Sequence, residues 1–492
     1  MESKHIVKLI RTKKSSFWLQ KSAEQKVKLF RQVASQVPAY HDFLKRNKIN
    51  ALKVNTLEEF KQLPQTDKKN YLRKYPLPNL CWEGTLEKPI VFTATSGSTG
   101  EPFYFPRESK LDWEYSVLAE LFASQSSNKK SPTLVIVCFG MGVWIGGVFT
   151  YQAFELANHN LKNISIITPG INKKEIFNAL RLLAPQYEQV ILAGYPPFIK
   201  DIIDEAEGND INLKKLGLRL LFAAETFTEA FRDYLVKNGG IKSPYLDTLN
   251  IYGSADLGAM AYETPVSILI RRLAMKNQQL FESIFSPIAK TPTLAQYNPL
   301  FINFESENGE ILVTANNTVP LIRYAIGDSG GTFTFNEMYH QLKLHGIDLR
   351  HEAQKAGIGK YIYELPFVFV YERKDFSTTL YGLQVYPEHI REALLGSGID
   401  YLTGRFTLIT KFNKKQNQFL EIDLELKQNK KITPRLKKRV LDQITTTLLL
   451  KNSEFRELHR HLGKRALPKL VFWTTGHPLH FAPGIKQKLV KK

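Results

Sequence analysis

Cysteine is almost absent from this chain of 492 residues, which has only Cys81 and Cys138. Two cysteines exclude a disulfide framework and any zinc site with four cysteine ligands, and they suit a reducing compartment. Long hydrophobic runs are also missing, since the longest, residues 134–149, has 16 residues of which four are glycine. A membrane-spanning helix needs about 20 apolar residues. The sequence therefore predicts no membrane span, and a buried strand with a glycine-rich loop at this run.

Signals of other protein classes are lacking as well. Residues 1–10 show neither the apolar stretch nor the small-residue cleavage site of a secretory signal, so we expect a cytoplasmic protein. The motif GxxxxGK followed by Ser or Thr does not occur, which excludes a Walker-type phosphate loop. Hydrophobic residues make up 43% and aromatic residues 12% of the chain. This is enough for a sizeable core and excludes a disordered protein.

Acidic residues are scarce relative to basic ones, with 47 Asp and Glu against 67 Lys and Arg and a net charge of +20. Residues 401–492 hold 21 of the basic and 6 of the acidic residues, or +15 of that charge. Such a surface suits a nucleotide, a thiol cofactor with phosphates or an acidic protein. The alternative is a solvated basic face without a partner. We expect no nucleic-acid partner, because the sequence shows no recognisable motif of a nucleic-acid-binding module.

The alternation of short β-rich and helical segments predicts the fold class. A helical lead-in is expected over residues 1–75, with a helix at 23–37 and a capping box at Thr56. Further along the chain we expect strands at 90–93, 133–139, 165–168, 190–193, 218–222, 250–252, 367–371, 406–411 and 419–426, and helices at 173–183, 197–206, 335–346 and 434–450. This alternation predicts an α/β protein with a mainly parallel sheet flanked by helices.

Two domains are expected. Residues 1–372 would form a large N-terminal α/β domain, and residues 373–492 a small, mobile, basic α+β domain. The segment 264–300 carries no legible motif, and about 40 residues at 331–372 are expected to shape the rim of the active site or a contact between domains.

A loop of Ser, Thr and Gly gives the strongest chemical signal. It follows the strand expected at 90–93 and consists of Thr95, Ser96, Gly97, Ser98, Thr99 and Gly100. Glycine permits a positive φ, so successive N–H groups can converge on an anion. Ser and Thr hydroxyls add donors for phosphate oxygens. Alone, such a loop fits either a phosphate site or a flexible turn.

Further motifs lie in order around this loop. They are LPQTDK at 63–68, TSGSTGEP at 95–102, FGMGVWIGG at 139–147, FAAE at 222–225, YGSAD at 252–256, PLIRYAIGD at 320–328, RKD at 373–375 with YGLQVYPEHI at 381–390, and PGIKQK at 483–488. Together they resemble the adenylate-forming superfamily of acyl-CoA synthetases, and most closely its phenylacetate-CoA ligase-like branch. The resemblance covers residues 60 to 488.

The resemblance implies an ATP site. Besides the loop at 95–100, it assigns to ATP the residues Ala224, Glu225, Tyr252, Gly253, Ser254, Arg323 and Asp328. Tyr252 would stack on adenine, Asp328 would accept hydrogen bonds from the ribose hydroxyls, and Arg323 would bring positive charge towards ribose and phosphate.

The resemblance also implies catalytic groups. Lys486 would stabilise charge between the carboxylate and the α-phosphate, although Ile485 interrupts the family's Gly-Lys pair and leaves Lys488 as an alternative. Arg373 would face the nucleotide, and Asp375 would act as the hinge of the small domain. Asp256 would reach Mg²⁺ through a carboxylate oxygen.

The acyl pocket is expected at Phe139, Trp144 and Gly146. The implied function is ATP-dependent activation of an aromatic or other apolar carboxylic acid to an acyl-adenylate with release of pyrophosphate, followed by transfer to CoA. The partners would be a small carboxylate and CoA. Two alternatives stay open: transfer to the thiol of an acyl carrier protein or to an amine, and a binding relative with weakened catalysis. Ala255 in place of a hydroxyl residue and Asp256 in place of Glu favour the last alternative.

Overall fold

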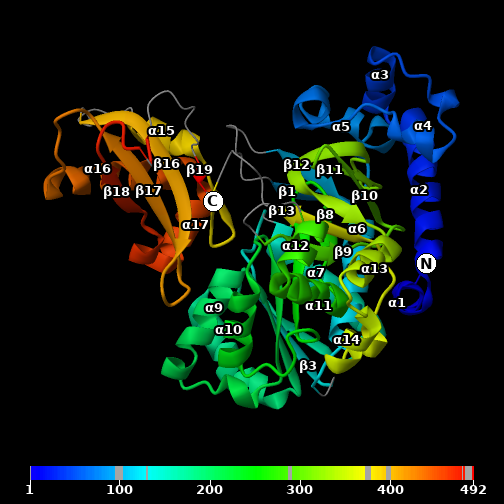
Figure 1. The fold of residues 1–492 in the computed structure, drawn as a ribbon, viewed down its shortest axis with the longest axis horizontal. Helices are drawn as coiled ribbons and strands as arrows, with labels where there is room; N and C mark the ends of the chain where they lie inside the picture. The colour runs from blue at the N-terminus through cyan, green and yellow to red at the C-terminus, as the bar shows by residue number, and fades with distance from the viewer. Residues whose placement is uncertain are drawn as a thin grey trace. The chain divides into compact units, whose positions relative to one another are not determined.

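The computed structural model describes residues 2–94, 103–128, 131–143, 145–285, 291–371, 378–394, 401–478, 480–481 and 490–491. The chain forms two compact units (Figure 1). Unit 1 comprises Met1–Ala94, Tyr104–Gly194 and Ile202–Glu372, and unit 2 comprises Thr95–Phe103, Tyr195–Asp201 and Arg373–Lys492.

The helices are numbered in chain order and carry the same labels in Figure 1. Their bounds are α1 Ser3–Thr12, α2 Ser15–Gln36, α3 Pro38–Arg46, α4 Leu57–Lys61, α5 Leu77–Leu80, α6 Ser109–Ser124, α7 Ile145–Leu161, α8 Lys173–Asn178, α9 Pro196–Glu205, α10 Glu229–Gly239, α11 Pro265–Lys276, α12 Gln278–Ile284, α13 Phe335–Leu344, α14 Leu349–Lys355, α15 Pro387–Leu394, α16 Pro434–Lys451 and α17 Ser453–Leu462.

The strands are short and mostly buried. Their bounds are β1 Val91–Ala94, β2 Tyr104–Arg107, β3 Thr133–Cys138, β4 Ile164–Ile167, β5 Gln189–Gly194, β6 Leu218–Ala223, β7 Thr248–Ser254, β8 Gly258–Tyr262, β9 Thr293–Gln296, β10 Ile302–Glu307, β11 Glu310–Ala315, β12 Leu321–Phe333, β13 Phe367–Tyr371, β14 Thr378–Leu380, β15 Leu383–Val385, β16 Leu402–Phe412, β17 Gln418–Leu426, β18 Lys469–Trp473 and β19 Val490–Lys491.

The N-terminal lead-in is helical, as its apolar spacing predicts. The helix expected at 23–37 is the second half of α2, which buries Phe30 and Val33. The capping box begins α4, because the Thr56 hydroxyl accepts from the Glu59 N–H while the Glu59 carboxylate accepts from the Thr56 N–H. In Figure 1 the helices α1 to α5 lie together at one side of unit 1.

One large sheet forms the centre of unit 1. Among the described residues eleven strands join it, in the order β10-β11-β12-β13-β9-β8-β7-β6-β5-β3-β4. The strands from β4 to β7 are parallel to their neighbours, while the pairings from β7 to β10 are antiparallel. The α/β fold is confirmed, but the sheet is mixed where the sequence predicted it mainly parallel. Connections such as the one between β7 and β8 are too short for the crossover that parallel neighbours need.

The parallel half of the sheet positions the candidate site. Strands β3 and β5 are buried at every residue, as expected where helices cover both faces. Phe139 follows β3, Ala224 follows β6 and Tyr252 lies near the end of β7. In open α/β sheets ligands bind at the carboxyl ends of the strands. Three of the candidate segments therefore lie at the edge where a ligand is expected.

Helices in the segments 264–300 and 331–372 form a hydrophobic layer of unit 1, and the rim or domain contact expected for 331–372 stays a prediction. Helices α11 to α14 bury residues such as Ile270, Met338 and Leu342 against Leu294 of β9 and Phe367 of β13. The helix expected at 335–346 is α13. These segments therefore support the sheet behind the site.

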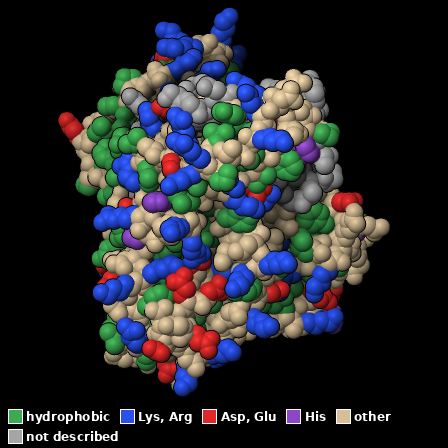
Figure 2. All heavy atoms as spheres, turned by 90° about the vertical axis from the view of Figure 1, so that its left-hand side faces the viewer, with side chains coloured by type: hydrophobic (Ala, Val, Ile, Leu, Met, Phe, Trp, Pro, Cys, Tyr) green, Lys and Arg blue, Asp and Glu red, His purple; other side chains and the backbone are tan. Residues whose placement is uncertain are grey.

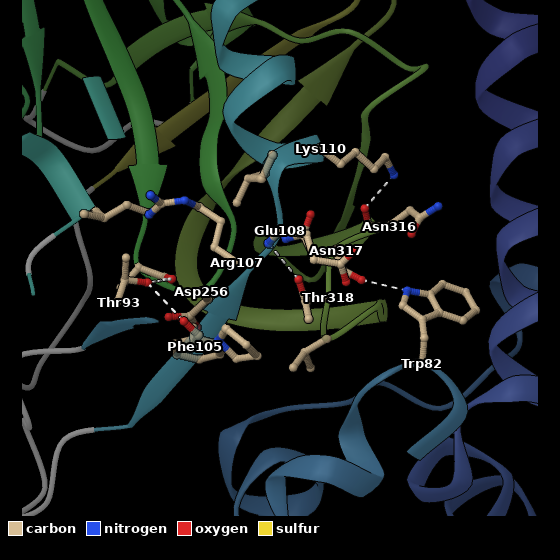
Figure 3. A pocket seen from close by; sticks show the side chains of 15 residues that line it. Trp82, Thr93, Phe105, Arg107, Glu108, Lys110, Asp256, Asn316, Asn317 and Thr318 are labelled. Atoms are coloured by element: carbon tan, nitrogen blue, oxygen red, sulfur yellow. Dashed lines mark hydrogen bonds between the residues drawn. The ribbon is translucent and has the colours of Figure 1, made fainter. Parts of the chain in front are cut away.

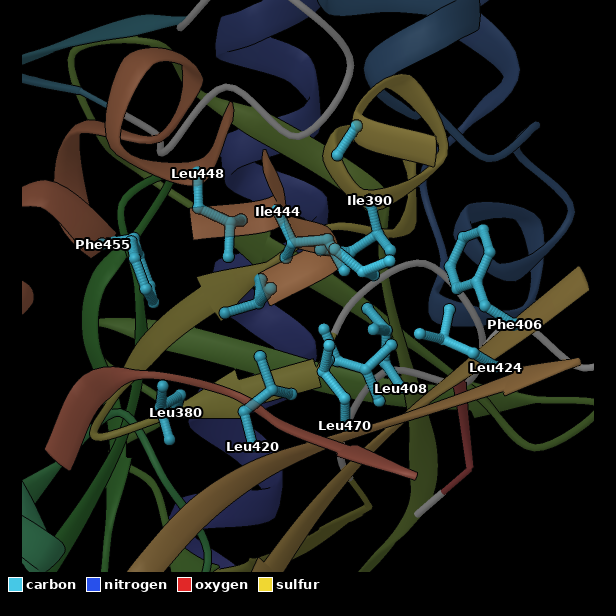
Figure 4. Packing of buried hydrophobic residues seen from close by; sticks show 14 of the residues in the cluster. Leu380, Ile390, Phe406, Leu408, Leu420, Leu424, Ile444, Leu448, Phe455 and Leu470 are labelled. Carbon is cyan, nitrogen blue, oxygen red and sulfur yellow. The ribbon is translucent and has the colours of Figure 1, made fainter. Parts of the chain in front are cut away.

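Unit 2 has its own core. Strands β18-β17-β16-β19 form a four-stranded sheet, and β14 pairs with β15. Leu408 and Leu420 of this sheet pack against Ile444 and Leu448 of α16 (Figure 4). The strands expected at 406–411 and 419–426 and the helix at 434–450 are confirmed.

The surface of unit 2 is basic around the start of α16. Lys427, Lys430, Lys431, Lys437 and Lys438 are exposed, and the first turn of α16 has no acidic residue. Figure 2 shows many Lys and Arg side chains on the face that it draws. No helix in the described part of the chain has the length and apolar character to cross a membrane.

Candidate active site

The described residues contain only part of the expected site. The candidates outside them are Thr95, Ser96, Gly97, Ser98, Thr99, Gly100, Trp144, Arg373, Asp375, Lys486 and Lys488. The roles that the resemblance implies for these residues stay predictions.

Tyr252 and Asp328 come together although they are far apart in the sequence. The Tyr252 hydroxyl donates to Asp328 Oδ2 at 2.6 Å. Asp328 is 8% exposed and follows Gly327, whose φ of +88° is a conformation that glycine adopts without strain. The aromatic ring expected under adenine and the carboxylate expected at the ribose are thus in direct contact.

Asn250 is a candidate that the sequence analysis missed. Its side chain is buried, and Nδ2 donates to the Glu225 carbonyl at 3.0 Å, while Oδ1 has no hydrogen-bond partner among the described residues. A buried acceptor without a partner is costly, and adenine offers an amino group that could donate to it. An asparagine two residues before Tyr252, in the middle of a buried strand, was the available signal.

The backbone on both sides of Asn250 is constrained. Ala224 has a φ of +77°, which is rare for a residue with a side chain, and Glu225 is 7% exposed. A Cβ atom at Gly253 would lie 2.6 Å from the Gly258 carbonyl oxygen, so only glycine fits there. The hydroxyl of Ser254 is buried without a partner among the described residues. The segments 224–225 and 252–254 therefore form one tightly built region.

Asp256 is held by two donors. The Tyr324 hydroxyl donates to Asp256 Oδ2 at 2.7 Å, and Lys68 Nζ lies 3.2 Å from the same oxygen. Lys68 reaches this point because its segment is tied to β12, where the Thr66 N–H donates to the Arg323 carbonyl. The LPQTDK and YGSAD motifs therefore meet in space.

The residues at Asp256 do not fit a metal ligand as they are arranged. The carboxylate of Asp256 is 2% exposed, and its Oδ2 is already paired with the ammonium of Lys68. Within the described ranges, no group of three or more His, Cys, Asp or Glu residues could hold a metal ion. Mg²⁺ thus stays a prediction from the sequence.

The side chain of Arg323 binds the lead-in segment. Its guanidinium donates to the Leu63 carbonyl and, at 2.6 Å, to Glu307 Oε2, and Nε lies 3.7 Å from Glu305 Oε1. The side chain is 6% exposed. These contacts hold residues 63–68 against β12, whereas no contact joins the guanidinium to Tyr252 or Asp328 among those described.

Phe139 and Gly146 pack on each other. A Cβ atom at Gly146 would lie 3.2 Å from the ring of Phe139, which is 1% exposed. Neither residue is among those that line the two pockets described below. The glycine-rich segment thus allows the start of α7 to lie close to the end of β3.

The first pocket adjoins Ala255 and Asp256 (Figure 3). Its other lining residues include Thr93, Phe105 and Arg107 of the β1–β2 hairpin. The lining is completed by Trp82, Pro106, Glu108, Lys110, Leu111, Ile145 and residues 316–319. In Figure 3 Thr93, Arg107 and Asp256 lie on one side of the pocket, and Trp82 and Asn316 on the other. The expected phosphate loop at 95–100 lies outside the described residues.

The second pocket is more apolar. Val117, Leu118, Leu257 and Met260 are among its lining residues, and Asn317 lines both pockets. Burial raises the pKa of Glu114, at its edge, to about 8. Burial thus favours the neutral form of this carboxyl group over the carboxylate.

Comparison with solved structures identifies the fold. A structure of 2-hydroxyisobutyryl-CoA ligase with 2-HIB-AMP and CoA in the thioesterification state aligns with a TM-score of 0.64 and 15% identity, over 95% of this chain and 89% of that one. Its postadenylation state with R3-HIB-AMP gives 0.53 and 14%, over 96% and 88%. An open conformation with 2-HIB-AMP and CoA gives 0.52 and 15%, over 96% and 91%.

These alignments show that the chain shares the fold of these CoA ligase structures. The resemblance predicted from the motifs is thereby confirmed for the fold. No protein-family model and no curated protein matches the sequence. The phenylacetate-CoA ligase-like branch stays a prediction.

Proposed function

We propose that this protein is an ATP-dependent acid–thiol ligase. A carboxylate oxygen of the acid attacks the α-phosphorus of ATP, the bond to the bridging oxygen breaks, and pyrophosphate leaves. The sulfur of CoA then attacks the carbonyl carbon of the acyl-adenylate. AMP leaves with the oxygen of the former carboxylate, and the thiol proton passes to solvent.

The observation that carries this proposal is the contact of Tyr252, near the carboxyl end of β7, with Asp328 of β12, and Asn250 lies on the same strand as Tyr252. The ring of Tyr252 offers a stacking surface, and Asp328 can accept from both ribose hydroxyls. The open Oδ1 of Asn250 can accept from the adenine amino group. The hydrogen bond of 2.6 Å fixes the first two groups relative to each other, which supports the proposal of a nucleotide site that is organised in advance.

The remaining roles follow the sequence motifs and belong to this proposal. The loop at 95–100 would hold the outer phosphates, and Lys486 or Lys488 would stabilise charge developing as the adenylate forms. Arg373 and Asp375 would belong to a mobile domain at 373–492. The basic surface of unit 2 suits the phosphates of CoA, and an acyl carrier protein or an amine would be the alternative acceptor.

The acid is a small carboxylate with a partly apolar acyl group. The first pocket adjoins Asp256, and the second offers Leu118, Leu257 and Met260 to a hydrocarbon. This lining supports the expectation of an aromatic or apolar acyl group through residues other than Phe139.

Product analysis tests the proposal. The protein is incubated with ATP, Mg²⁺ and CoA and a panel of aryl, arylacetic, hydroxy, fatty and amino acids. We expect AMP and pyrophosphate to form only when the right acid is present, and a thioester mass to appear only with CoA. Formation of ADP, or of AMP without any acid, would contradict the proposal.

A matched pair of tyrosines provides the control. Tyr252→Ala removes the stacking ring and should raise the KM for ATP by about 10-fold or more, the scale of about 1–3 kcal/mol for one base on an aromatic ring. Tyr234 also donates to a carboxylate, Asp204, at 2.7 Å, but lies outside the site. Tyr234→Ala should leave the KM unchanged.

A further inference from the structure

The first pocket contains a buried arginine whose donors are not all used. Arg107 is 3% exposed, and its Nε lies 2.8 Å from Asp112 Oδ1. The guanidinium stacks over the ring of Phe149 at 4.9 Å. Its Nη1 has no hydrogen-bond partner among the described residues. A buried donor left without a partner destabilises the folded protein, and a ligand with an acceptor would remove that cost.

A second donor in the same pocket is also unpaired. The backbone of Asn317 is fixed, because its carbonyl accepts from Trp82 Nε1 at 2.8 Å. Its Nδ2 is buried and has no partner in the described part of the chain. Asn317 lies where the first and second pockets adjoin. Two residues with such donors, Arg107 of β2 and Asn317 of the β11–β12 connection, therefore line the same pocket.

The charges of the lining decide what kind of acceptor fits. Arg107 and Lys110 are the basic residues of the lining, and Glu108 and Asp256 are the acidic ones. Arg107 has Asp112 as its own counter-charge. The pocket therefore has no excess of positive charge to hold a second carboxylate, which would be buried at high cost. A neutral oxygen that accepts hydrogen bonds suits both donors.

We infer that the acid activated by this protein carries a neutral hydrogen-bond acceptor, such as a hydroxyl, keto or amide oxygen, on its acyl part. This inference rests on the proposed function. The acceptor would bind at the part of the pocket that Arg107 and Asn317 line. This inference narrows the expected substrates to acids with such an oxygen and excludes acids whose acyl part is a plain hydrocarbon.

Matched pairs of acids test this inference. In each pair a hydroxyl or keto oxygen is replaced by a methyl or methylene group of similar size, and acid-dependent ATP–pyrophosphate exchange is measured. The wild type should prefer the oxygen-bearing member by at least about 10-fold in kcat/KM, because a site built for hydrogen bonding discriminates strongly against an analogue that lacks the group. Arg107→Met and Asn317→Leu should each bring the ratio towards one.

A matched arginine controls for loss of a buried ion pair. Arg219 is 0% exposed and its Nε lies 3.1 Å from Asp247, but it lines neither pocket. Arg219→Met should lower stability yet keep the wild-type ratio. If Arg107→Met does not fold, Asn317→Leu alone decides, since it removes no charge.

The outcomes separate the two levels of the proposal. Exchange with equal rates for both members of every pair, or a ratio that Arg107→Met and Asn317→Leu leave unchanged, would overturn this inference and leave the proposed function standing. If no acid of the panel supports exchange, the proposed function is overturned and this inference with it.

Discussion

Glu114 shows how burial of a single residue sets a pH dependence. Its pKa is raised by burial to about 8 from an ordinary value of 4.5, although Lys110 Nζ lies 3.6 Å away. Between these two values the folded chain keeps a proton that the unfolded chain has lost. The free energy of unfolding therefore falls as the pH rises from 4.5 to 8 and levels off above it.

Glu114→Gln should remove this dependence. The neutral amide cannot ionise, so we expect a higher Tm than that of the wild type at pH 9 and a difference that shrinks as the pH falls to 5. Thermal unfolding in a series of buffers measures it. An equal change of Tm at every pH would mean that Glu114 is ionised in the folded protein throughout.

At the scale of residues, the sequence predicted which groups could bind ATP but not all of their partners. The meeting of Tyr252 and Asp328 follows from the motif order and the resemblance. The contact of Lys68 with Asp256 does not, because it depends on how the lead-in segment is tied to β12. The open donors of Arg107 and Asn317 belong to no motif and are visible only as unpaired atoms in a pocket.

Helix α11 gives the segment 264–300 a role at the scale of elements. Arg271 of this helix is 0% exposed, donates to the Phe227 carbonyl and lies 3.1 Å from Glu263 Oε1. Glu263 Oε2 in turn accepts from the Asn250 N–H at 3.0 Å. One arginine therefore supports both the loop after β6 and the strand that carries Asn250.

Arg271→Lys should weaken the binding of ATP and leave the binding of the acid unchanged. Lysine keeps the charge but cannot bridge the carbonyl and the carboxylate as the guanidinium fork does. We expect the KM for ATP to rise by about 10-fold, the scale of one charge-assisted hydrogen bond, with little change in the KM for the acid.

Arg219→Lys is the control for this prediction. Arg219 is equally buried but lies at the amino end of β6, away from the ATP side. Steady-state kinetics of both variants should show a change in the KM for ATP only for Arg271→Lys. An equal change in both variants would reduce the role of Arg271 to general stability.

The elements themselves were largely predictable. Buried runs such as 133–139 and 190–193 are strands because apolar residues that face helices on both sides form continuous hydrophobic segments. The antiparallel pairing in the other half of the sheet was not predicted from the sequence. The neighbours of β9, for example, are β8 and β13, and β13 lies far along the chain. Local patterns do not encode such distant pairing.

At the scale of the whole molecule, each unit buries its own core. Leu342 belongs to the cluster of unit 1 and Leu420 to that of unit 2, and both are 1% exposed or less. We therefore expect two transitions in calorimetric unfolding. Leu342→Ala and Leu420→Ala should each destabilise one unit by about 2–5 kcal/mol.

Each of these variants should shift a different transition. Calorimetry of both proteins measures the shifts, with the wild type as reference. A single transition that moves equally in both variants would mean that the two units unfold as one.

Acid-dependent ATP–pyrophosphate exchange tests the central claim most directly, and Asp328→Asn is the decisive variant. The wild type should exchange label only with a suitable acid, and Asp328→Asn should lower kcat/KM for ATP by about 10-fold to 100-fold, the scale of hydrogen bonds to a charged group. Asp204→Asn, which changes the matched carboxylate beside Tyr234, should exchange like the wild type. Exchange that Asp328→Asn leaves intact, or no exchange with any acid in a protein that is folded, would contradict the account.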